Sequence, residues 1–519
     1  MKRRPDYEIA LKGAPFGATV VHLVIALTHG GPVAVPDVSA YLNITQRLWG
    51  GFSIPELPYH PGFGLVVGPF GFLEGDAVHT AALCVNAVLA GLTVWMVQRL
   101  MHYFTAPRGV LWFGTALAFL HPSITHGSRV AWPEVLLVVV LLWIALLIGK
   151  PDVQRWGIAG CLAGLAPVIH PRAIVVTAAI LIVGCISKRA QRTILGTAAG
   201  LTVTAVTLQL TDTWQAARAN AAQQIGSEPG PLATGAGQWL AFTTTTAGLG
   251  AVGVLTGLTF IWRRKKTSPE ENVLRFLALS ALAMLVVGAW VLAGSARPDT
   301  LLYGRYMDPW AVPITISFLC VIASRIPSRR ITTAAAVTVI LSCLITVVES
   351  EHATQAARGI MTASLRVFWV VTAEKLALTL LVATMLSLIS FVGFHRYLKP
   401  TLGGLLLVAS VSTVLTHAHL REVGQVADGQ MTTAHLVPES VTCLSHDRST
   451  TKPYAIWLYR IQLPKIEHTV INLPGGETPC GEYVIAGQDA LKNCLGSEFL
   501  GKEPRAGWGL WRYPQNKCG

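Results

Sequence analysis

Long apolar segments fill most of this chain, and they restrict the folds open to it more than any other feature. A straight helix needs about 20 apolar residues to cross a bilayer, so shorter segments are expected to be kinked or half-length. About thirteen segments are candidates, at residues 14–32, 77–98, 109–121, 131–149, 157–170, 173–187, 193–210, 238–261, 276–294, 309–324, 331–348, 376–394 and 401–417. They predict an all-α polytopic membrane domain with about 13 transmembrane helices.

The charge content agrees with a membrane protein. Charged residues make up 13% of the 519 residues, whereas soluble domains contain about 25%. Most of the surface is therefore expected to face lipid. A net charge of +13 would suggest nucleic acid as the partner of a soluble protein. Here the positions of the basic residues explain the charge, and no nucleic-acid partner is predicted.

The basic residues gather in the N-terminal segment and in every second connection between the apolar segments. They are Lys2 to Arg4 with Lys12, Arg99 with Arg108, Lys150 with Arg155, Lys188 to Arg192, Arg263 to Lys266, Arg325 to Arg330, and Arg396 with Lys399. The positive-inside rule places all of them in the cytoplasm. The first apolar segment lacks a small-residue cleavage site and is predicted to be a retained span. The predicted protein is a multi-pass cell-membrane protein with its C-terminus outside.

The predicted domains are a transmembrane domain at residues 1–417 and a hydrophilic extracytoplasmic domain at 418–519. In the second domain, residues 454–463 are apolar enough for a helix, and residues 482–486 resemble a short strand that ends at Gly487. Proline and glycine interrupt the rest. A small α/β module is therefore expected.

Four cysteines, Cys443, Cys480, Cys494 and Cys518, lie in the last 80 residues, in the part predicted to be outside. Such an environment favours two disulfides, with three pairings open. The other cysteines lie in or beside apolar segments, where a thiol behaves as a small hydrophobic group. They are Cys84, Cys161, Cys185, Cys320 and Cys343.

Two acidic residues stand at outer span ends. Asp37 follows the first span directly, where a carboxylate can act as a general base or hold a metal ion. Alternatively, Asp37 or Ser39 caps the helical stretch that follows at residues 41–49. Glu134 opens a later span, where an ionisable side chain is either functional or simply favourable at a helix N-terminus.

Other polar and aromatic residues occupy the same outward connections. They are Tyr59 and His60 in the first, His126 and Arg129 in the second, His170 and Arg172 between the fifth and sixth segments, and Arg305 and Tyr306 before the tenth. Some of these aromatic residues can instead mark a turn or form an interfacial belt.

Arginine is strongly preferred over lysine in the outward connections. The outward arginines are Arg47, Arg129, Arg172, Arg218, Arg297, Arg305, Arg358 and Arg366, and Lys375 is the exception. The guanidinium fork binds phosphate bidentately and lysine cannot, so the bias predicts an outer site for a phosphate or pyrophosphate. A high genomic GC content would also favour arginine, but on both sides of the membrane.

At these residues the chain resembles the GT-C glycosyltransferases, in particular their protein-mannosyltransferase and aminoarabinose-transferase-like branch. The matching elements, over roughly residues 14–325, are Asp37 with Tyr41, Tyr59-His60-Pro61 leading to Pro69-Phe70, Pro133-Glu134, the reordered His170-Pro171-Arg172, and Gly304-Arg305-Tyr306 with Pro309.

The resemblance implies a hexosyl- or pentosyltransferase. Its donor would be a polyprenyl-phosphate sugar, and its acceptor a cell-envelope glycan, lipid or protein on the outer face. It implies Asp37 as the catalytic base, with Glu134 as the alternate, and Arg129, Arg172 and Arg305 as donor-phosphate ligands. Many relatives carry paired acidic residues where Val38 follows Asp37. No cofactor is therefore certain, a divalent metal stays open, and metal ligands are unknown.

Two other functions compete. A transporter or flippase of an anionic or lipid-linked substrate would carry polar residues inside its spans and show inverted repeats. The ionisable residues here lie at outer span ends instead, which favours the enzyme. A non-catalytic scaffold could use Trp457, Trp508 and Trp511 to stack on sugar rings, although these tryptophans can equally form the core of the C-terminal domain.

The alternation of basic connections predicts that the C-terminus lies outside the cytoplasm. A reporter enzyme that is active only outside, fused after Gly519, should be active. The matched fusion after Lys150, in a connection predicted to be cytoplasmic, should be silent. Activity of the Lys150 fusion together with silence of the C-terminal one would reverse the topology.

Overall fold

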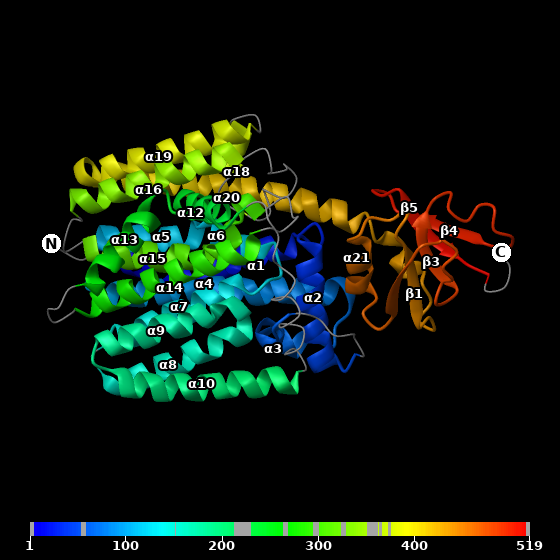
Figure 1. The fold of residues 1–519 in the computed structure, drawn as a ribbon, viewed down its shortest axis with the longest axis horizontal. Helices are drawn as coiled ribbons and strands as arrows, with labels where there is room; N and C mark the ends of the chain where they lie inside the picture. Colours follow the sequence, from blue (N-terminus) through cyan, green and yellow to red (C-terminus); the bar gives the residue numbers. More distant parts are fainter. Residues whose placement is uncertain are drawn as a thin grey trace. The chain divides into compact units, whose positions relative to one another are not determined.

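The computed structural model describes residues 5–52, 59–150, 152–211, 230–262, 268–293, 300–322, 328–349, 362, 366–371 and 375–514. Its helices and its C-terminal sheet are shown in Figure 1. The α-helices are α1 (Pro5–Leu27), α2 (Val35–Thr45), α3 (Gly62–Val67), α4 (Gly75–Tyr103), α5 (Arg108–Leu120), α6 (Pro122–Thr125), α7 (Glu134–Ile148), α8 (Val153–Ile169), α9 (Ile174–Ile186), α10 (Ala190–Leu210), α12 (Pro231–Thr245), α13 (Leu249–Ile261), α14 (Pro269–Leu292), α15 (Asp308–Ile322), α16 (Arg329–Val348), α18 (Arg366–Val371), α19 (Leu376–Arg396), α20 (Leu398–Asp428) and α21 (Ala455–Gln462).

Each predicted apolar segment overlaps one of these helices or, at residues 238–261, a pair of them. Within the described residues, seven helices are long and apolar enough to cross a membrane, or eight if the bent pair is one span. Four shorter apolar helices, α7, α8, the segment containing α9, and α15, accompany them. The chain is a multi-pass membrane protein.

The apolar segment at 238–261 is not the straight span that was predicted. It forms α12 and α13, which are bent by 110° relative to each other. The break follows a threonine run whose hydroxyls bond to the helix backbone, for example Thr244 Oγ1 to the Leu240 carbonyl at 2.8 Å. Ala247 and Gly248 then take left-handed backbone angles, with φ of 44° and 88°. Such angles cannot continue an α-helix.

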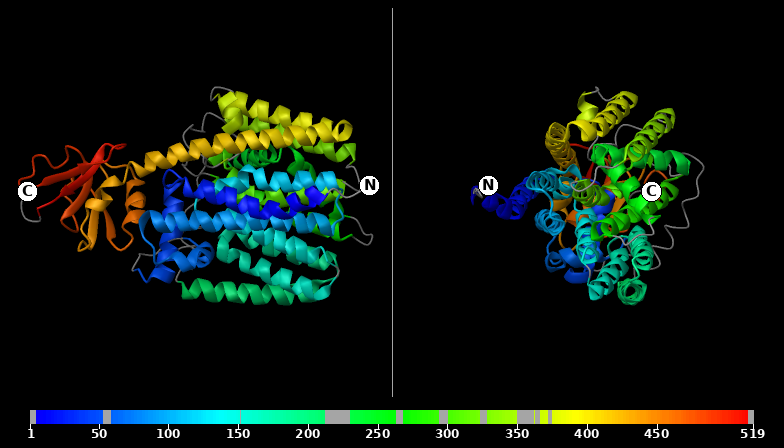
Figure 2. Two further views of the ribbon diagram at one scale, coloured as in Figure 1. Left: turned by 180° about the vertical axis from the view of Figure 1, so that it is seen from behind. Right: turned by 90° about the vertical axis from the view of Figure 1, so that its left-hand side faces the viewer.

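Helices α8, α9 and α10 lie side by side in both orientations (Figures 1 and 2). Glycines allow α8 and α10 to approach closely. A Cβ added to Gly196 would lie 1.9 Å from the Gly157 carbonyl oxygen, and one added to Gly200 would lie 2.2 Å from that of Cys161. Small residues at such contacts let helix backbones pack directly in a membrane, where the hydrophobic effect between helices is weak.

The chain forms two compact units, each described separately below. The helical unit contains Met1–Val24, Asn86–Ser128 and Pro133–Ala418, and the mixed unit contains Ile25–Val85, Arg129–Trp132 and His419–Gly519. The predicted domain boundary after residue 417 falls within α20, which continues to Asp428.

The C-terminal part of the mixed unit is a small α/β module, as predicted. Its strands are β1 (Cys443–Asp447), β2 (Glu467–Ile471), β3 (Tyr483–Gly487), β4 (Glu498–Lys502) and β5 (Trp508–Arg512). The sheet order is β2-β1-β3-β5-β4. Strand β1 is parallel to β2 and β3, whereas β5 is antiparallel to β3 and β4. Helix α21 and strand β3 match the two elements expected from the sequence.

Two of the three candidate sugar-stacking tryptophans belong to the core of this module. Trp508 and Trp511 are each 3% exposed and pack in separate hydrophobic clusters. Trp457 is partly buried against Ala40 and Ile44, and the Arg460 guanidinium lies 4.9 Å from its ring centroid. Trp508 and Trp511 therefore form part of the core of the C-terminal domain, which was the alternative to sugar stacking.

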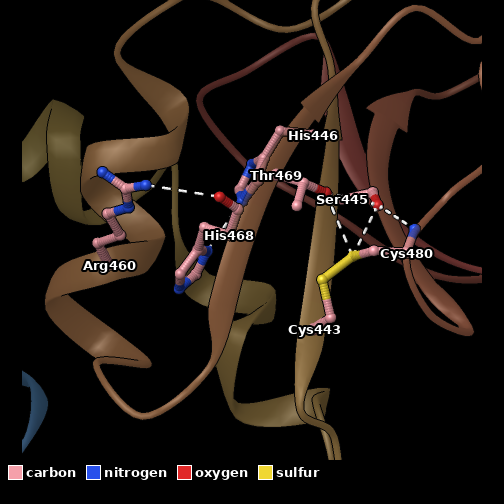
Figure 3. Close-up of a disulfide and its surroundings, with 7 residues drawn as sticks. All are labelled: Cys443, Ser445, His446, Arg460, His468, Thr469 and Cys480. Atoms are coloured by element: carbon pink, nitrogen blue, oxygen red, sulfur yellow. Dashed lines mark hydrogen bonds between the residues drawn. A yellow bond between two sulfur atoms is a disulfide. The ribbon is translucent and has the colours of Figure 1, made fainter. Parts of the chain in front are cut away.

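Cys443 and Cys480 form a disulfide with their Cα atoms 5.9 Å apart (Figure 3). It joins the start of β1 to the segment before β3. This pairing is one of the three that the sequence left open. Cys494 and Cys518 remain for the second predicted disulfide, which stays a prediction because Cys518 lies outside the described residues.

Two buried histidines lie on β1 and β2 beside this disulfide (Figure 3). His468 Nε2 donates to the Leu463 carbonyl at 3.0 Å, so the Nδ1 of the neutral ring accepts from His446 Nε2, also at 3.0 Å. Burial lowers the pKa of His468 from 6.5 to about 4. Burial and the neighbouring His468 hold the pKa of His446 well below its usual value.

This pair should make the C-terminal module acid-sensitive. Between pH 6.5 and 4 the unfolded chain binds protons that the folded module excludes, so stability present above pH 6.5 is lost as the pH falls. The folded pKa of His468, about 4, corresponds to a loss on the order of 3 kcal/mol. Hydrogen exchange of β1 and β2 amides, corrected for intrinsic rates, should accelerate over this range. His468→Gln should reduce the pH dependence, whereas changing the exposed His435 to Gln should not. Equal pH dependence in both variants would contradict the assignment.

Candidate functional site

A pocket of about 330 Å³ in the helical unit is built from helix starts that are distant in the sequence. Glu134 opens α7 directly after Pro133. His170 and Arg172 flank Pro171 at the short helix η4 (Pro171–Ala173). The third segment contains η6 (Gly304–Tyr306) and the start of α15. The remaining lining residues are Leu137, Ile169, Ala173, Met284, Pro309 and Trp310.

Proline explains why these segments start helices at the pocket. Pro133, Pro171 and Pro309 each stand at or beside the first residue of a helix. Proline fits there because the first N–H groups of a helix have no partner within it. At η4 the His170 Nδ1 accepts from the Arg172 backbone N–H at 3.3 Å. Because helix N-termini carry partial positive charge, this arrangement favours an anionic ligand.

Arg305 and Glu134, which both line the pocket, form an ion pair. Arg305 Nε donates to Glu134 Oε1, and the two side chains are 4% and 11% exposed. The Arg305 Nη1 also lies 3.4 Å from the Tyr303 hydroxyl. A buried guanidinium needs such partners, since an unpaired charge there would be strongly destabilising.

The Arg172 guanidinium stacks on an aromatic ring. Its guanidinium carbon lies 3.7 Å from the centroid of the Tyr306 ring. The same ring contacts Tyr303 and His170, with centroid distances of 4.4 and 6.1 Å. Stacking fixes the plane of a guanidinium, whose N–H groups lie around its edge.

Asp308 is a residue that the sequence analysis did not select. It occupies the first turn of α15, is 5% exposed, and its Oδ1 has no hydrogen-bond partner within the described part of the chain. The charges of Glu134 and Arg305 act on it. The sequence could have indicated Asp308, because this residue opens an apolar segment as Glu134 does.

Asp37 lies in the mixed unit and does not cap a helix. Helix α2 begins at Val35, and its N-cap residue is Ala34, which makes no side-chain capping bond. The capping alternative for Asp37 is therefore wrong. Its Oδ1 accepts a hydrogen bond from the Tyr59 hydroxyl at 2.6 Å. The adjacent His60 is buried.

The remaining candidates are distributed between the units. Arg129, in the mixed unit, is 6% exposed and donates to the Thr28 carbonyl at 2.6 Å. His126 is buried in η3 (His126–Ser128) of the helical unit. Glu134, His170, Arg172, Arg305 and Tyr306 thus line one pocket, whereas His126, Arg129, Asp37, Tyr59 and His60 are not among its lining residues.

The described residues contain no group of three or more His, Cys, Asp or Glu side chains that could hold a metal ion. Three of the predicted outward arginines, Arg218, Arg297 and Arg358, lie outside the described residues.

No protein-family model matches the sequence, and no curated protein matches it. The structure is similar to that of ArnT from Cupriavidus metallidurans bound to undecaprenyl phosphate, with a TM-score of 0.60 over 100% of both chains at 13% identity. The apo structure of ArnT matches with a TM-score of 0.56 over 96% of both chains at 14% identity. This chain has the GT-C fold.

The GT-C fold agrees with the resemblance found in the sequence, which covered residues 14–325. The structural similarity extends over the whole chain. An oligosaccharyltransferase from Archaeoglobus fulgidus, tethered to an acceptor peptide, matches with a TM-score of only 0.44, at 10% identity, over 98% of this chain and 75% of the other.

Proposed function

We propose that this protein is a membrane glycosyltransferase that moves a sugar from a polyprenyl-phosphate donor to an acceptor hydroxyl on the outer face of the membrane. One observation carries the proposal. Glu134, His170, Arg172, Arg305 and Tyr306, selected from three distant sequence segments, line a single pocket in a chain with the GT-C fold.

The pocket suits a phosphate group. Arg172 and Arg305 supply two guanidinium groups, one stacked on Tyr306 and one paired with Glu134. Both are pre-oriented, so little side-chain entropy is lost when a ligand binds. The similar ArnT structure is bound to undecaprenyl phosphate, and we infer a ligand of the same chemistry for this pocket.

In the proposed reaction the acceptor oxygen attacks the anomeric carbon of the donor sugar. The bond from that carbon to the phosphate oxygen breaks, and polyprenyl phosphate leaves with the electron pair. The acceptor proton passes to a carboxylate. We assign that role to Asp37, which the Tyr59 hydroxyl orients. Glu134 is the weaker candidate, because its carboxylate is already paired with Arg305.

Arg305→Lys should weaken donor binding although it preserves the charge, since lysine cannot reproduce a bidentate contact. Loss of one charge-assisted hydrogen bond predicts a dissociation constant about 10- to 150-fold higher. Binding of a short-chain polyprenyl-phosphate sugar to purified protein can be measured by calorimetry. Arg448→Lys, at an exposed position in the C-terminal module, is the matched control. Equal donor affinity in both variants would remove Arg305 from the phosphate site.

Asp37→Asn tests the base and the proposed function together. Asparagine preserves the size of the side chain but not its basic lone pair, so transfer from a synthetic polyprenyl-phosphate sugar should fall about 100- to 10,000-fold. Donor binding should stay close to that of the unmodified protein. A full rate for Asp37→Asn with a large loss for Glu134→Gln would assign the base to Glu134. No transfer by the unmodified protein to any glycan, lipid or protein acceptor, together with donor movement across vesicles, would favour a flippase.

A further inference from the structure

A second pocket, of about 450 Å³, lies in the helical unit at the break between α12 and α13. Its walls also include residues of α5, α15 and α18, and the middle of α20. None of its lining residues belongs to the pocket that contains Arg305. We call it the hydroxyl pocket, after the threonine and serine side chains that line it.

The polar side of the hydroxyl pocket presents neutral hydrogen-bonding groups. Thr315 is 1% exposed, and its hydroxyl has no hydrogen-bond partner within the described part of the chain. Thr244 and Thr245 donate to their own helix at 2.8 and 2.9 Å, and their hydroxyls add uncharged polar groups to the lining. His121 Nδ1 accepts from the Ser123 backbone N–H, so the neutral ring carries its proton on Nε2.

The other side of the pocket is apolar. Phe113, Leu117, Phe368, Leu405 and Val408 line it, and its described lining contains no Asp, Glu, Lys or Arg side chain. A charged ligand would find no counter-charge there, and burying an unpaired charge is strongly unfavourable. The pocket with Arg172 and Arg305, in contrast, is lined by charged side chains.

The helix break is a further observation that indicates a binding site. Irregular backbone inside a membrane protein persists only where it is buried in protein or lines a cavity. Ala247, a non-glycine residue, has a φ of 44° and lines the pocket. Such backbone strain persists only where the surroundings impose it, and it is often found at ligand sites. Beside it, a Cβ on Gly248 would lie 2.5 Å from the Phe391 ring.

We infer that the hydroxyl pocket binds an uncharged membrane lipid whose head group is a free hydroxyl, with diacylglycerol as the simplest example. The lipid hydroxyl would bond to Thr315 and Thr244, and its chains would lie against the aromatic and aliphatic wall. This site does not depend on the proposed transfer reaction.

The probe is a photoactivatable diacylglycerol added to the full-length protein in lipid nanodiscs, with labelled peptides identified by mass spectrometry. Labels should map to residues 113–122, 244–249 and 405–412. Dioctanoylglycerol should compete for the site, and the matching phosphatidic acid should compete much less. Thr315→Val, which removes one hydrogen bond without changing size, should reduce labelling about 2- to 10-fold. Ala409→Phe, which fills the pocket, should abolish it.

Ser317→Ala is the matched control. Ser317 is also a buried α15 hydroxyl without a partner within the described residues, but it does not line the pocket. Its labelling should equal that of the unmodified protein. Unfolding temperatures of all variants, measured in parallel, separate loss of the site from loss of the fold. The inference would be overturned if neither Thr315→Val nor Ala409→Phe reduced the labelling. It would also be overturned if phosphatidic acid competed more strongly than dioctanoylglycerol.

Discussion

The scarcity of water inside a membrane is the constraint on which the rest of this structure depends. Backbone polar groups must be satisfied within helices there, and charged side chains are stable only at span ends or with a partner. Several ionisable residues of the chain lie where helices begin. Glu134, the Pro171–Ala173 turn and Asp308 all stand at such starts. Packing of the helices brings these starts together. The polar side chains at the starts then line a common pocket.

Within that pocket the pair of Arg305 and Glu134 has two consequences. It makes a buried guanidinium tolerable, and it fixes the direction in which the guanidinium presents its donors. Arg172 reaches a similar result through the Tyr306 ring. The hydroxyl pocket meets the same constraint in a different way. Its polar atoms belong to uncharged side chains, so they need no partner of opposite charge. The two pockets differ in lining charge, and they are proposed to differ in ligand for that reason.

Local signals made much of this architecture predictable. Long apolar segments predicted the helices, and Glu134 was predicted to open one of them. Other features depended on geometry. Asp37 has a strong capping preference, yet α2 starts earlier, at Val35, and the carboxylate accepts from Tyr59 instead. Asp308 opens an apolar segment as Glu134 does. Only the structure showed that its carboxylate is buried and subject to the charges of Arg305 and Glu134.

The sequence by itself determined that this chain enters a membrane, where its helices lie, and that its C-terminal part forms a small α/β module. Those properties follow from hydrophobicity and periodicity, which act over a few turns of chain. Only the tertiary structure decided that residues near 134, 170 and 305 share one pocket, that Cys443 pairs with Cys480, and that α12 and α13 bend by 110°. These outcomes depend on packing between segments up to 171 positions apart, and no local pattern encodes the relative orientation of such segments.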